Sequence, residues 1–440
     1  MLQPLLRPAA AAANDRLRGA SPLALPAPPV LDLDFVGRPS LHYPGLPPIT
    51  FTRSSTAARV NASGQVETVA ADVARFDHHP LTGARLGLLV EEARTNLILR
   101  SEDFSHAAWT RDNATAAGTA AAPDGADAAQ RLSEDTGTGQ HRARQTVAAS
   151  FAAGASLTIS CFIKAAGRGF ATLQFGAANG FRACFDLAAF TPAPGFAGAA
   201  FGTGSFTAAG AQRFPGGWLR CWVTGKEDPA ATVGEAYLNI VRAASYTDSY
   251  TGDGASGVLA WGYQVEAGPF PSSYVATTGA TATRGADAAT LDRITPWYNA
   301  AEGTLLAEAE LLAGASGAAY ILASLNDAST NNEIDARIRA SNVPAGFVTT
   351  GTVAQGNVQA AVTGPTANVS FRLALAFKVD DLAASAFGAA PGTDGSVTLP
   401  IVTRLELGAF GGANRMNGRL RRVSCWSTRL ANPVVQILSQ

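Results

Sequence analysis

One short stretch of the chain gathers many of the side chains that act as acids, bases or metal ligands in proteins. Residues 75–98, RFDHHPLTGARLGLLVEEARTNLI, hold two adjacent histidines, several arginines, an aspartate and a pair of glutamates. Only 15% of the whole chain is charged, against roughly a quarter in an average soluble protein. Such a cluster is typical either of an active site or of a polar scaffold that supports another surface.

The glutamate pair, Glu91 and Glu92, follows a predicted turn and an apolar strand. Adjacent residues on a strand point to opposite faces, whereas glycoside hydrolysis needs two carboxyl groups about 5–10 Å apart across one bond. We therefore interpret the stretch as a structural polar cluster whose ion pairs pin an irregular loop onto a sandwich. The neighbouring His78 and His79 lack a third ligand at chelating spacing, and we assign them no role. The cluster comprises Arg75, Asp77, Glu91, Glu92, Arg94 and Asn96.

A second carboxylate motif lies in NEIDARIRA, where Glu333 and Asp335 fall on one face of a predicted strand. Laminarinase-type glucanases carry a Glu-x-Asp-x-Glu strand, and the last carboxylate is their acid/base. Arg337 stands at that position here. Because the retaining mechanism fails without an acid/base, we predict no catalytic residue and no enzyme activity.

Composition excludes several classes of protein. The chain has 33 Lys and Arg against 34 Asp and Glu, with no basic stripe of the kind that nucleic-acid binding requires. The four cysteines lack metal-ligand spacing and sit in apolar runs, which predicts buried free thiols rather than a zinc site or disulfides. No continuous apolar segment has the length of a membrane span or the form of a secretory signal. We expect synthesis in the cytoplasm and no membrane insertion.

The elements that position these residues are predicted to be strands. Short runs rich in β-branched and aromatic residues recur between turns, as in ASLTISCFIK, GFATLQFG and GEAYLNIV, and no helical period is long enough for a parallel crossover. GTLLAEAELLA is ambiguous between helix and strand, and its alternation favours a strand. The sequence predicts an all-β chain of two antiparallel, jelly-roll-type β-sandwiches in tandem after an extended Pro-rich arm. The predicted divisions are 1–49, 50–280 and 281–440.

Three segments resemble known virion modules. Residues 51–110, FTRSS…HAAWT, resemble a module of bacteriophage and prophage tail fibres and tail spikes. WGYQVEAGPFPSSYVATTGATATRGAD resembles the closing strand and exit of the carbohydrate-binding-module-like jelly roll that follows it there. RLELGAFGGANRMNGRLRRVSCWSTRLANPVVQILS is similar to the last strands of a concanavalin-A/laminin-G-like sandwich. No parallel β-helix, common in polysaccharide-cleaving spikes, separates them.

This resemblance implies a virion fibre or spike protein of a phage, prophage or gene-transfer particle. Its expected partners are a bacterial surface polysaccharide, capsule or lipopolysaccharide, and other virion proteins through the arm. Weak single sites favour a homo-oligomer, trimeric or pentameric. Two alternatives stay open, a polysaccharide depolymerase and a purely architectural decoration of the virion.

Sugar binding requires aromatic faces and a few planar polar groups on a concave sheet or in loops. The candidates in the first sandwich are Trp109, Phe170, Phe181, Tyr237, Tyr246 and Tyr250. Trp218 and Trp222 share one face and are interpreted as core residues. No cofactor is expected. A structural calcium ion would draw on acids without EF-hand spacing, namely Asp124, Asp127, Asp248 and Asp253.

Overall fold

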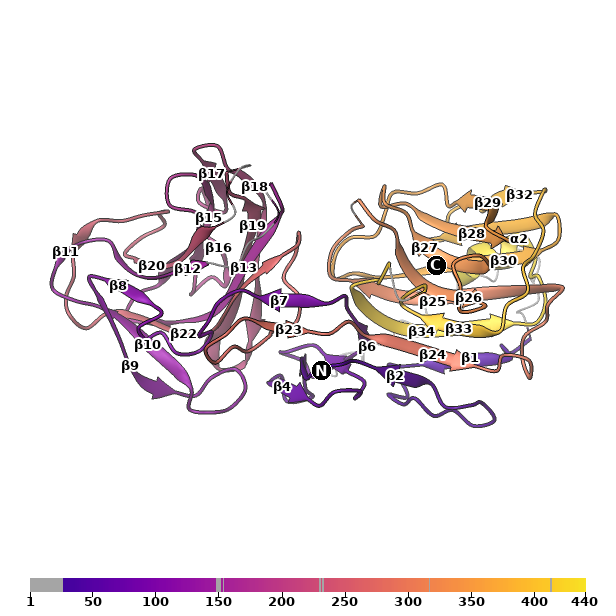
Figure 1. Cartoon of the computed structure of the whole chain (residues 1–440), viewed down its shortest axis with the longest axis horizontal. Coiled ribbons are helices and arrows are strands. Elements are labelled where there is room, and N and C mark those ends of the chain that lie inside the picture. The colour runs from indigo at the N-terminus through magenta and orange to yellow at the C-terminus, as the bar shows by residue number, and fades with distance from the viewer. Residues whose placement is uncertain are drawn as a thin grey trace, which may run out of the picture.

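The computed structural model shows two β-sandwiches side by side along the long axis of the molecule (Figure 1). Among the residues that the structure describes, antiparallel strands make up nearly all of the regular structure, with one short α-helix, α2 (Asn432–Leu438), near the C-terminus. The predicted all-β fold class is confirmed. The structure describes residues 27–147, 152, 154–228, 231, 233–315, 317–411 and 414–440. Most of the predicted arm therefore lies outside the described residues.

The first sandwich is a jelly roll of two antiparallel sheets. One sheet has the order β18 (Ser205–Phe214), β19 (Trp218–Lys226), β13 (Leu157–Ala166), β22 (Gly257–Ala267), β10 (Ala129–Glu134) and β9 (Ala114–Ala120). The other has the order β16 (Thr191–Pro192), β15 (Gly180–Asp186), β14 (Phe170–Phe175), β20 (Gly234–Val241), β12 (His141–Val147) and β8 (Thr110–Asp112). β17 (Ala199–Phe201) also pairs with β15, and β11 (Thr138–Gly139) pairs with β21 (Tyr250–Thr251).

Strand alternation builds the core of this jelly roll. Leu157, Ile159, Cys161 and Ile163 on β13 all point into it and are fully buried, as the period-two pattern predicts. All four cysteines of the chain are buried and free. Burial raises the pKa of the Cys161 thiol far above its ordinary value, which keeps it protonated.

The second sandwich also has two sheets. One has the order β32 (Gly392–Asp394), β31 (Asp381–Ala386), β30 (Ser370–Lys378), β25 (Glu302–Leu311), β34 (Gly418–Trp426), β6 (Arg85–Val90) and β5 (Phe76–His78), with β1 (Leu31–Asp34) also on β34. The other has the order β2 (Thr50–Thr52), β24 (Ala288–Asp292), β33 (Arg404–Leu407), β26 (Tyr320–Asn326), β27 (Glu333–Ile338), β28 (Pro344–Thr350) and β29 (Val353–Gln359). The ambiguous segment GTLLAEAELLA thus forms a strand, β25.

Strand pairing does not follow the predicted boundaries at residues 49 and 280. Leu31 of β1 lies opposite Cys425, Phe51 of β2 lies opposite Ala289, and Leu88 of β6 lies opposite Leu420. N-terminal strands therefore complete the C-terminal sandwich, and part of the predicted arm belongs to its core. Alternation in a sequence identifies a strand and its two faces but not its partner, which is why the sequence did not reveal this pairing.

Two small β-structures lie between the sandwiches. β7 (Arg94–Asn96) and β23 (Ala282–Arg284) form a ribbon through which the chain enters and leaves the jelly roll (Figure 1). β3 (Ala57–Val60) and β4 (Val66–Val69) form a separate hairpin.

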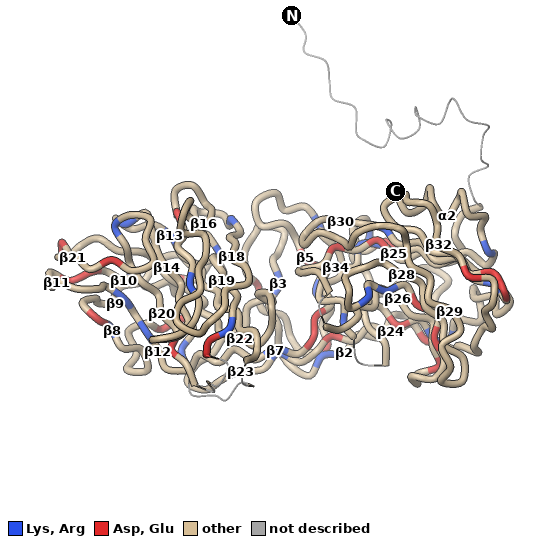
Figure 2. Tube along the Cα trace, turned by 90° about the horizontal axis from the view of Figure 1, so that it is seen from above, with Lys and Arg blue, Asp and Glu red and all other residues tan. Residues whose placement is uncertain are grey.

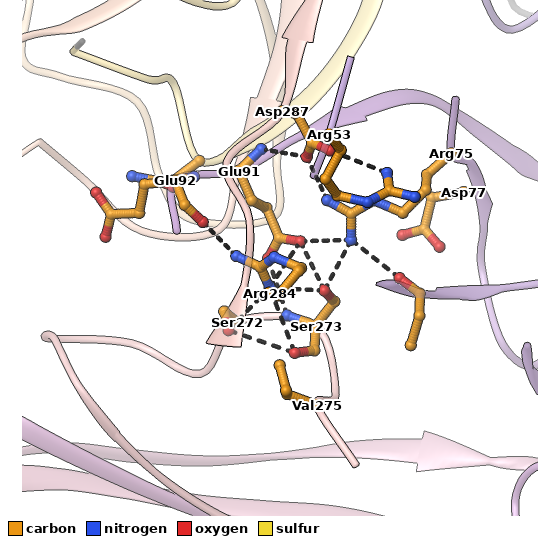
Figure 3. A network of polar contacts seen from close by, with 12 residues as sticks. Arg53, Arg75, Asp77, Glu91, Glu92, Ser272, Ser273, Val275, Arg284 and Asp287 are labelled. Carbon is orange, nitrogen blue, oxygen red and sulfur yellow. Dashed lines mark hydrogen bonds and ion pairs between the residues drawn. The ribbon is translucent and has the colours of Figure 1, made fainter. Parts of the chain in front are cut away.

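A network of buried charges joins these segments (Figure 3). The Arg75 guanidinium is fully buried and donates to Glu91 Oε2 at 2.7 Å and to Asp287. Asp287 also accepts from Arg53 Nη1 at 3.1 Å and from the Glu91 backbone N–H at 2.9 Å. Arg284 reaches Glu91 Oε2 at 3.2 Å. Three segments that are distant in sequence are therefore held together at one point.

The remaining members of the predicted polar cluster also make structural contacts. Asp77 accepts from the Val60 N–H at 2.8 Å and from Arg419 at 2.7 Å. Glu92 accepts from Arg94 Nε at 2.7 Å. Asn96 donates to the carbonyl oxygens of Tyr263 at 3.1 Å and Val275 at 2.8 Å. The glutamates Glu91 and Glu92 point to different surroundings, because Glu91 is fully buried whereas the Glu92 side chain is 43% exposed.

Replacing Glu91 should destabilise the fold far more than replacing its neighbour. Burial alone would raise the pKa of the Glu91 carboxyl, but Arg284 and Arg75 hold it well below its ordinary range. Glu91→Gln removes the carboxylate that pairs with the buried Arg284 and leaves Arg75 with Asp287 alone, and it should lower the free energy of unfolding by about 3–5 kcal/mol. Glu92→Gln, the matched control, should cost less than about 1 kcal/mol. Urea denaturation of both variants at neutral pH measures the difference.

The same loss should depend on pH. Because the pKa of Glu91 is lowered in the folded state, its stabilisation is present above the ordinary carboxyl pKa of about 4.3 and is lost only as pH falls towards the lower folded value. The gap between wild type and Glu91→Gln should therefore narrow only in strongly acidic solution. Equal losses from the two variants would contradict the structural role of Glu91.

Candidate functional site

Two of the predicted sugar-binding residues are core residues. Trp109 and Phe181 are fully buried in the jelly roll. The Trp109 ring packs against Phe104 and Tyr263 at centroid distances of 4.8 and 5.2 Å, and Phe181 stacks on Phe175 at 5.8 Å. Neither ring has a free face for a ligand, so the prediction for these two residues was wrong. Phe181 follows a glycine in the sequence, but its register on β15 turns it inward.

Tyr250 is also occupied by the protein itself. Its hydroxyl donates to Glu134 Oε2 at 2.6 Å, and the guanidiniums of Arg168 and Arg242 lie over its ring at 5.7 and 4.3 Å. Burial and the Glu134 carboxylate raise the pKa of this phenol. Tyr250 therefore fastens the loop after β20 and does not present its ring on a sheet face.

Tyr237, a candidate on β20, lies in a row of polar side chains on the outer face of the jelly-roll sheet. Gln174 on β14 stands opposite Tyr237 on β20 and opposite Arg182 on β15. In the next row Asn239 stands opposite Thr172. Residues two apart on a strand share a face, so these side chains lie together while Leu173 and Leu238 between them enter the core.

Three polar atoms on this face are buried without a hydrogen-bond partner among the residues that the structure describes. They are Gln174 Oε1, Asn239 Oδ1 and Arg182 Nε. Leaving a buried polar group unsatisfied costs about 1–3 kcal/mol, and native structures hold few such groups. Two acceptors and one donor on one sheet face match the hydroxyl groups of a sugar, each of which can both donate and accept.

Aromatic rings border the same face. The Arg182 guanidinium lies between the rings of Tyr246 and Phe201, at 4.8 Å from each centroid. Phe170 and Tyr246 are partly buried in one small cluster at this end of the sheet. Burial lowers the pKa of Arg182, whose position between two rings provides no carboxylate partner. The structure thus brings Phe170, Tyr237 and Tyr246 to one sheet face of the jelly roll. Tyr237 is 4% exposed, its hydroxyl donates to Glu235 and the Arg142 guanidinium lies 4.9 Å from its ring centroid, so the protein itself occupies this ring as it does that of Tyr250.

Carboxyl groups lie where β20 begins. Glu235 accepts from Arg144 Nη1 at 2.7 Å and from the Tyr237 hydroxyl. Burial, with the charges of Asp228 and Glu235, raises the pKa of Glu227 to about 7. Glu227 therefore titrates near neutral pH.

Sequence reasoning missed Gln174, Arg182 and Asn239. The sequence held a signal for Gln174 and Asn239. In GFATLQFG, Gln174 alternates with apolar residues, and in GEAYLNIV, Asn239 does the same. Polar residues on alternate positions of neighbouring strands indicate a shared polar face once the strand order is known. Strand order comes only from the structure.

The second predicted motif also forms a polar face, on β27 of the C-terminal sandwich. Arg337 donates through Nε to Asp335 Oδ1 at 2.7 Å and pairs with Glu333 Oε2 at 3.1 Å. The Phe347 ring lies 3.9 Å from the same guanidinium. A fixed cation therefore stands between the carboxyl groups at the position where the glucanases carry their third carboxylate.

No group of three or more His, Cys, Asp or Glu in the described part of the chain is arranged to hold a metal ion. Of the acids considered for calcium, Asp248 pairs with Arg242 at 3.2 Å, and Asp253 accepts the backbone N–H groups of Ala255 and Ser256. Among the described residues, no helix is long and apolar enough to cross a membrane.

Comparison with known proteins gives weak likenesses. No family model matches the chain, and no curated protein matches it. Among solved structures, a carbohydrate-binding module of a Ruminococcus gnavus sialidase, bound to α2,3-sialyllactose, has a TM-score of 0.28 at 16% identity, over 32% of this chain and 84% of that one. Chicken galectin 2 has a TM-score of 0.20 at 9% identity, over 28% and 88%.

A tail fibre protein of an E. coli phage has a TM-score of 0.19 at 10% identity, over 77% of this chain and 40% of that one. The first of these three proteins is bound to a sugar, and the third is a phage tail fibre protein. At TM-scores this low, neither a shared architecture nor a shared function follows from the likeness.

The polar face on β27 generates a prediction about pH. Burial and the neighbouring Asp335 charge raise the pKa of Glu333 from 4.5 to about 8. A carboxyl whose folded pKa is raised binds its proton more tightly when folded, so the stability of the protein falls as pH rises from about 4.5 to 8. Glu333→Gln should flatten this slope, and Glu67→Gln, at a side chain that is 41% exposed, should change it far less. Thermal unfolding across that pH range measures the slope, and an unchanged slope in Glu333→Gln would refute the assignment.

Proposed function

We propose that this chain is a fibre or spike subunit of a virion, and that it binds bacterial surface polysaccharide for adsorption to the host cell. The observation that carries the sugar-binding part is the row of unpaired polar atoms on the outer face of the jelly-roll sheet, bordered by Tyr237 and Tyr246. The virion part is supported by the resemblance of residues 51–110 to fibre and spike modules.

The face offers the two kinds of contact that sugars need. The oxygens of Gln174 and Asn239 accept from sugar hydroxyls, Arg182 donates to a sugar oxygen, and the Tyr246 ring offers an apolar surface for the C–H face of a pyranose. Gln174, Tyr237 and Asn239 are only 6%, 4% and 3% exposed, so a sugar reaches the two oxygens by displacing the side chains that cover them, which makes the binding of a single sugar weak. Linked copies would raise the effective concentration at a repetitive polymer, so we propose a homo-oligomer that is attached to other virion proteins through the N-terminal arm.

We propose binding without cleavage. Glycoside hydrolysis needs one carboxylic acid and one carboxylate across a bond. In the C-terminal sandwich Arg337 pairs with both Glu333 and Asp335, and on the jelly roll Glu235 is engaged by Arg144 and Tyr237. Carboxyl groups that are paired in this way are poorly suited to act as the proton donor and as the nucleophile or base that a depolymerase requires.

The proposal is tested by incubating the purified protein with encapsulated and capsule-free host cells. Bound protein and the chain length of released polysaccharide are followed together. We expect capsule-dependent binding and intact polymer. Release of shortened polymer would contradict the adhesin function and indicate a depolymerase. Equal binding to both kinds of cell would indicate an architectural role within the virion.

Single substitutions locate the binding face. Gln174→Ala and Tyr246→Ala should each reduce capsule binding by about tenfold, which corresponds to the loss of one hydrogen-bonded or stacking contact of about 1.4 kcal/mol. Gln355→Ala removes a glutamine from the other sandwich and serves as the matched control. Binding that is unchanged in both jelly-roll variants, with retained circular dichroism, would move the site away from this face.

A further inference from the structure

A cleft of about 560 Å³ lies between the two sandwiches. Its walls come from β18 and β19 of the jelly roll, from residues 269–274, from the β3–β4 hairpin and from loop residues of the C-terminal sandwich, including Leu312 and Asn368. Figure 2 shows β3 between the strands β18 and β19 on one side and β5 and β34 on the other. The volume lies within the range of about 300–1,000 Å³ that is typical of ligand sites.

Two side chains on β19 give the cleft its chemistry. Trp222 pairs across the sheet with Gly210, and Arg220 pairs with Gln212. Because they are two residues apart, Trp222 and Arg220 share a face, with about 6.5 Å between their positions on the strand. A Cβ atom at Gly210 would lie 2.6 Å from Cζ2 of the Trp222 indole. The glycine therefore lets the indole lie against β18, and the ring stays only partly buried in the cleft wall.

The charge of Arg220 is not balanced by a bonded carboxylate. Its Nη2 donates to two neutral oxygens, Ser160 Oγ at 3.2 Å and the Ser272 carbonyl at 2.7 Å. Its Nε is buried without a partner among the described residues. Burial lowers the pKa of this guanidinium, and the more distant charges of Glu266 and Glu91 offset that effect only in part.

The acids in the cleft wall have other partners. Asp77 accepts from the Val60 N–H and pairs with Arg419 at 2.7 Å. Glu91 is held by Arg75, by Arg284 and by the Ser273 N–H at 2.8 Å. Within the described part of the cleft, Arg220 is therefore a partly buried cation that lies beside the Trp222 indole and has no bonded carboxylate.

We propose that this cleft is a second sugar site, distinct from the jelly-roll sheet face, and that it takes a carboxylated sugar of the surface polysaccharide. This inference rests on the proposed function and names the sugar class. The apolar face of the pyranose stacks on Trp222, and its carboxylate accepts from the Arg220 guanidinium. A neutral sugar in the same place would leave the guanidinium without a charged acceptor, which disfavours it.

The test compares two sugars that differ only in the carboxylate, methyl β-D-glucuronide and methyl β-D-glucoside. Each is titrated into the full-length protein by NMR or calorimetry. We expect the glucuronide to bind at least about tenfold more tightly, the effect of one charge-assisted hydrogen bond. Equal affinities would overturn the proposal.

Variants assign the selectivity to the cleft. Arg220→Gln should abolish the preference for the glucuronide, and Trp222→Ala should weaken binding of both sugars. Trp222→Ala keeps the test decisive if Arg220→Gln does not fold, because Trp222 is partly exposed and makes no hydrogen bond to residues 269–274. Gln355→Ala, on β29 of the C-terminal sandwich and away from the cleft, should change neither affinity. A glucuronide preference retained in folded Arg220→Gln would refute the assignment.

The two proposals can fail separately. If capsule-dependent binding persists and depends on Gln174 while no glucuronide preference exists, the second site is wrong and the adhesin function stands. If the cleft binds the glucuronide but no capsule-dependent binding occurs, the adsorption function fails and the cleft serves a different acidic ligand.

Discussion

The fold depends on one requirement, that charges removed from water must be paired. Arg75, Glu91 and Asp287 are completely buried, and each satisfies the others. Their partners come from the N-terminal strands, from the end of the jelly roll and from the segment that enters the C-terminal sandwich. An incorrect arrangement of any of these segments would leave a buried charge without its partner, at a cost of several kcal/mol. The network therefore favours one relative arrangement of the segments between the two sandwiches.

This constraint also shapes the surfaces proposed for binding. Ser273, which donates to Glu91, belongs to the segment 269–274 that forms a wall of the cleft. Ser272 in the same segment accepts from Arg220. The charge network and the cleft thus share a wall. The jelly-roll sheet face with Gln174 and Tyr237 is built differently, from the regular pairing of β14, β15 and β20. Its geometry depends on strand register and not on the network.

The sequence predicts the parts of this structure that local patterns control. Alternation on β13 and β25 identifies strands. Glu91 and Glu92 do not converge, as predicted, although they lie in the connection between β6 and β7 and not on a strand. Tyr237, Phe170 and Tyr246 were chosen because sugar binding requires aromatic rings, and the structure places them on one face of the jelly roll, where their role in binding stays a prediction. The sugar-binding prediction for Trp109 and Phe181 was wrong, because the sequence around an aromatic residue near a loop does not show whether strand register turns its side chain into the core or outward.

The sequence does not show which strands lie next to one another in the sheets. The pairing of β1 with β34 joins residues almost four hundred positions apart, and no local pattern specifies such a partner. The same limit hides the row formed by Tyr237, Gln174 and Arg182, whose members lie on three strands. Trp222 illustrates a subtler limit. It shares a face with Trp218, as predicted, but the prediction that it is a core residue was wrong, because that face of β19 turns away from the jelly-roll core and Trp222 is only partly buried in the cleft wall.

The central claim, that the jelly-roll sheet face binds sugar, is tested most directly by a crystal structure of the protein with an oligosaccharide fragment of the host capsule. The account predicts sugar density across β14, β15 and β20, with hydroxyl groups within hydrogen-bond distance of Gln174 Oε1 and Asn239 Oδ1. A bound oligosaccharide that leaves both oxygens unpaired and lies elsewhere on the molecule would contradict it.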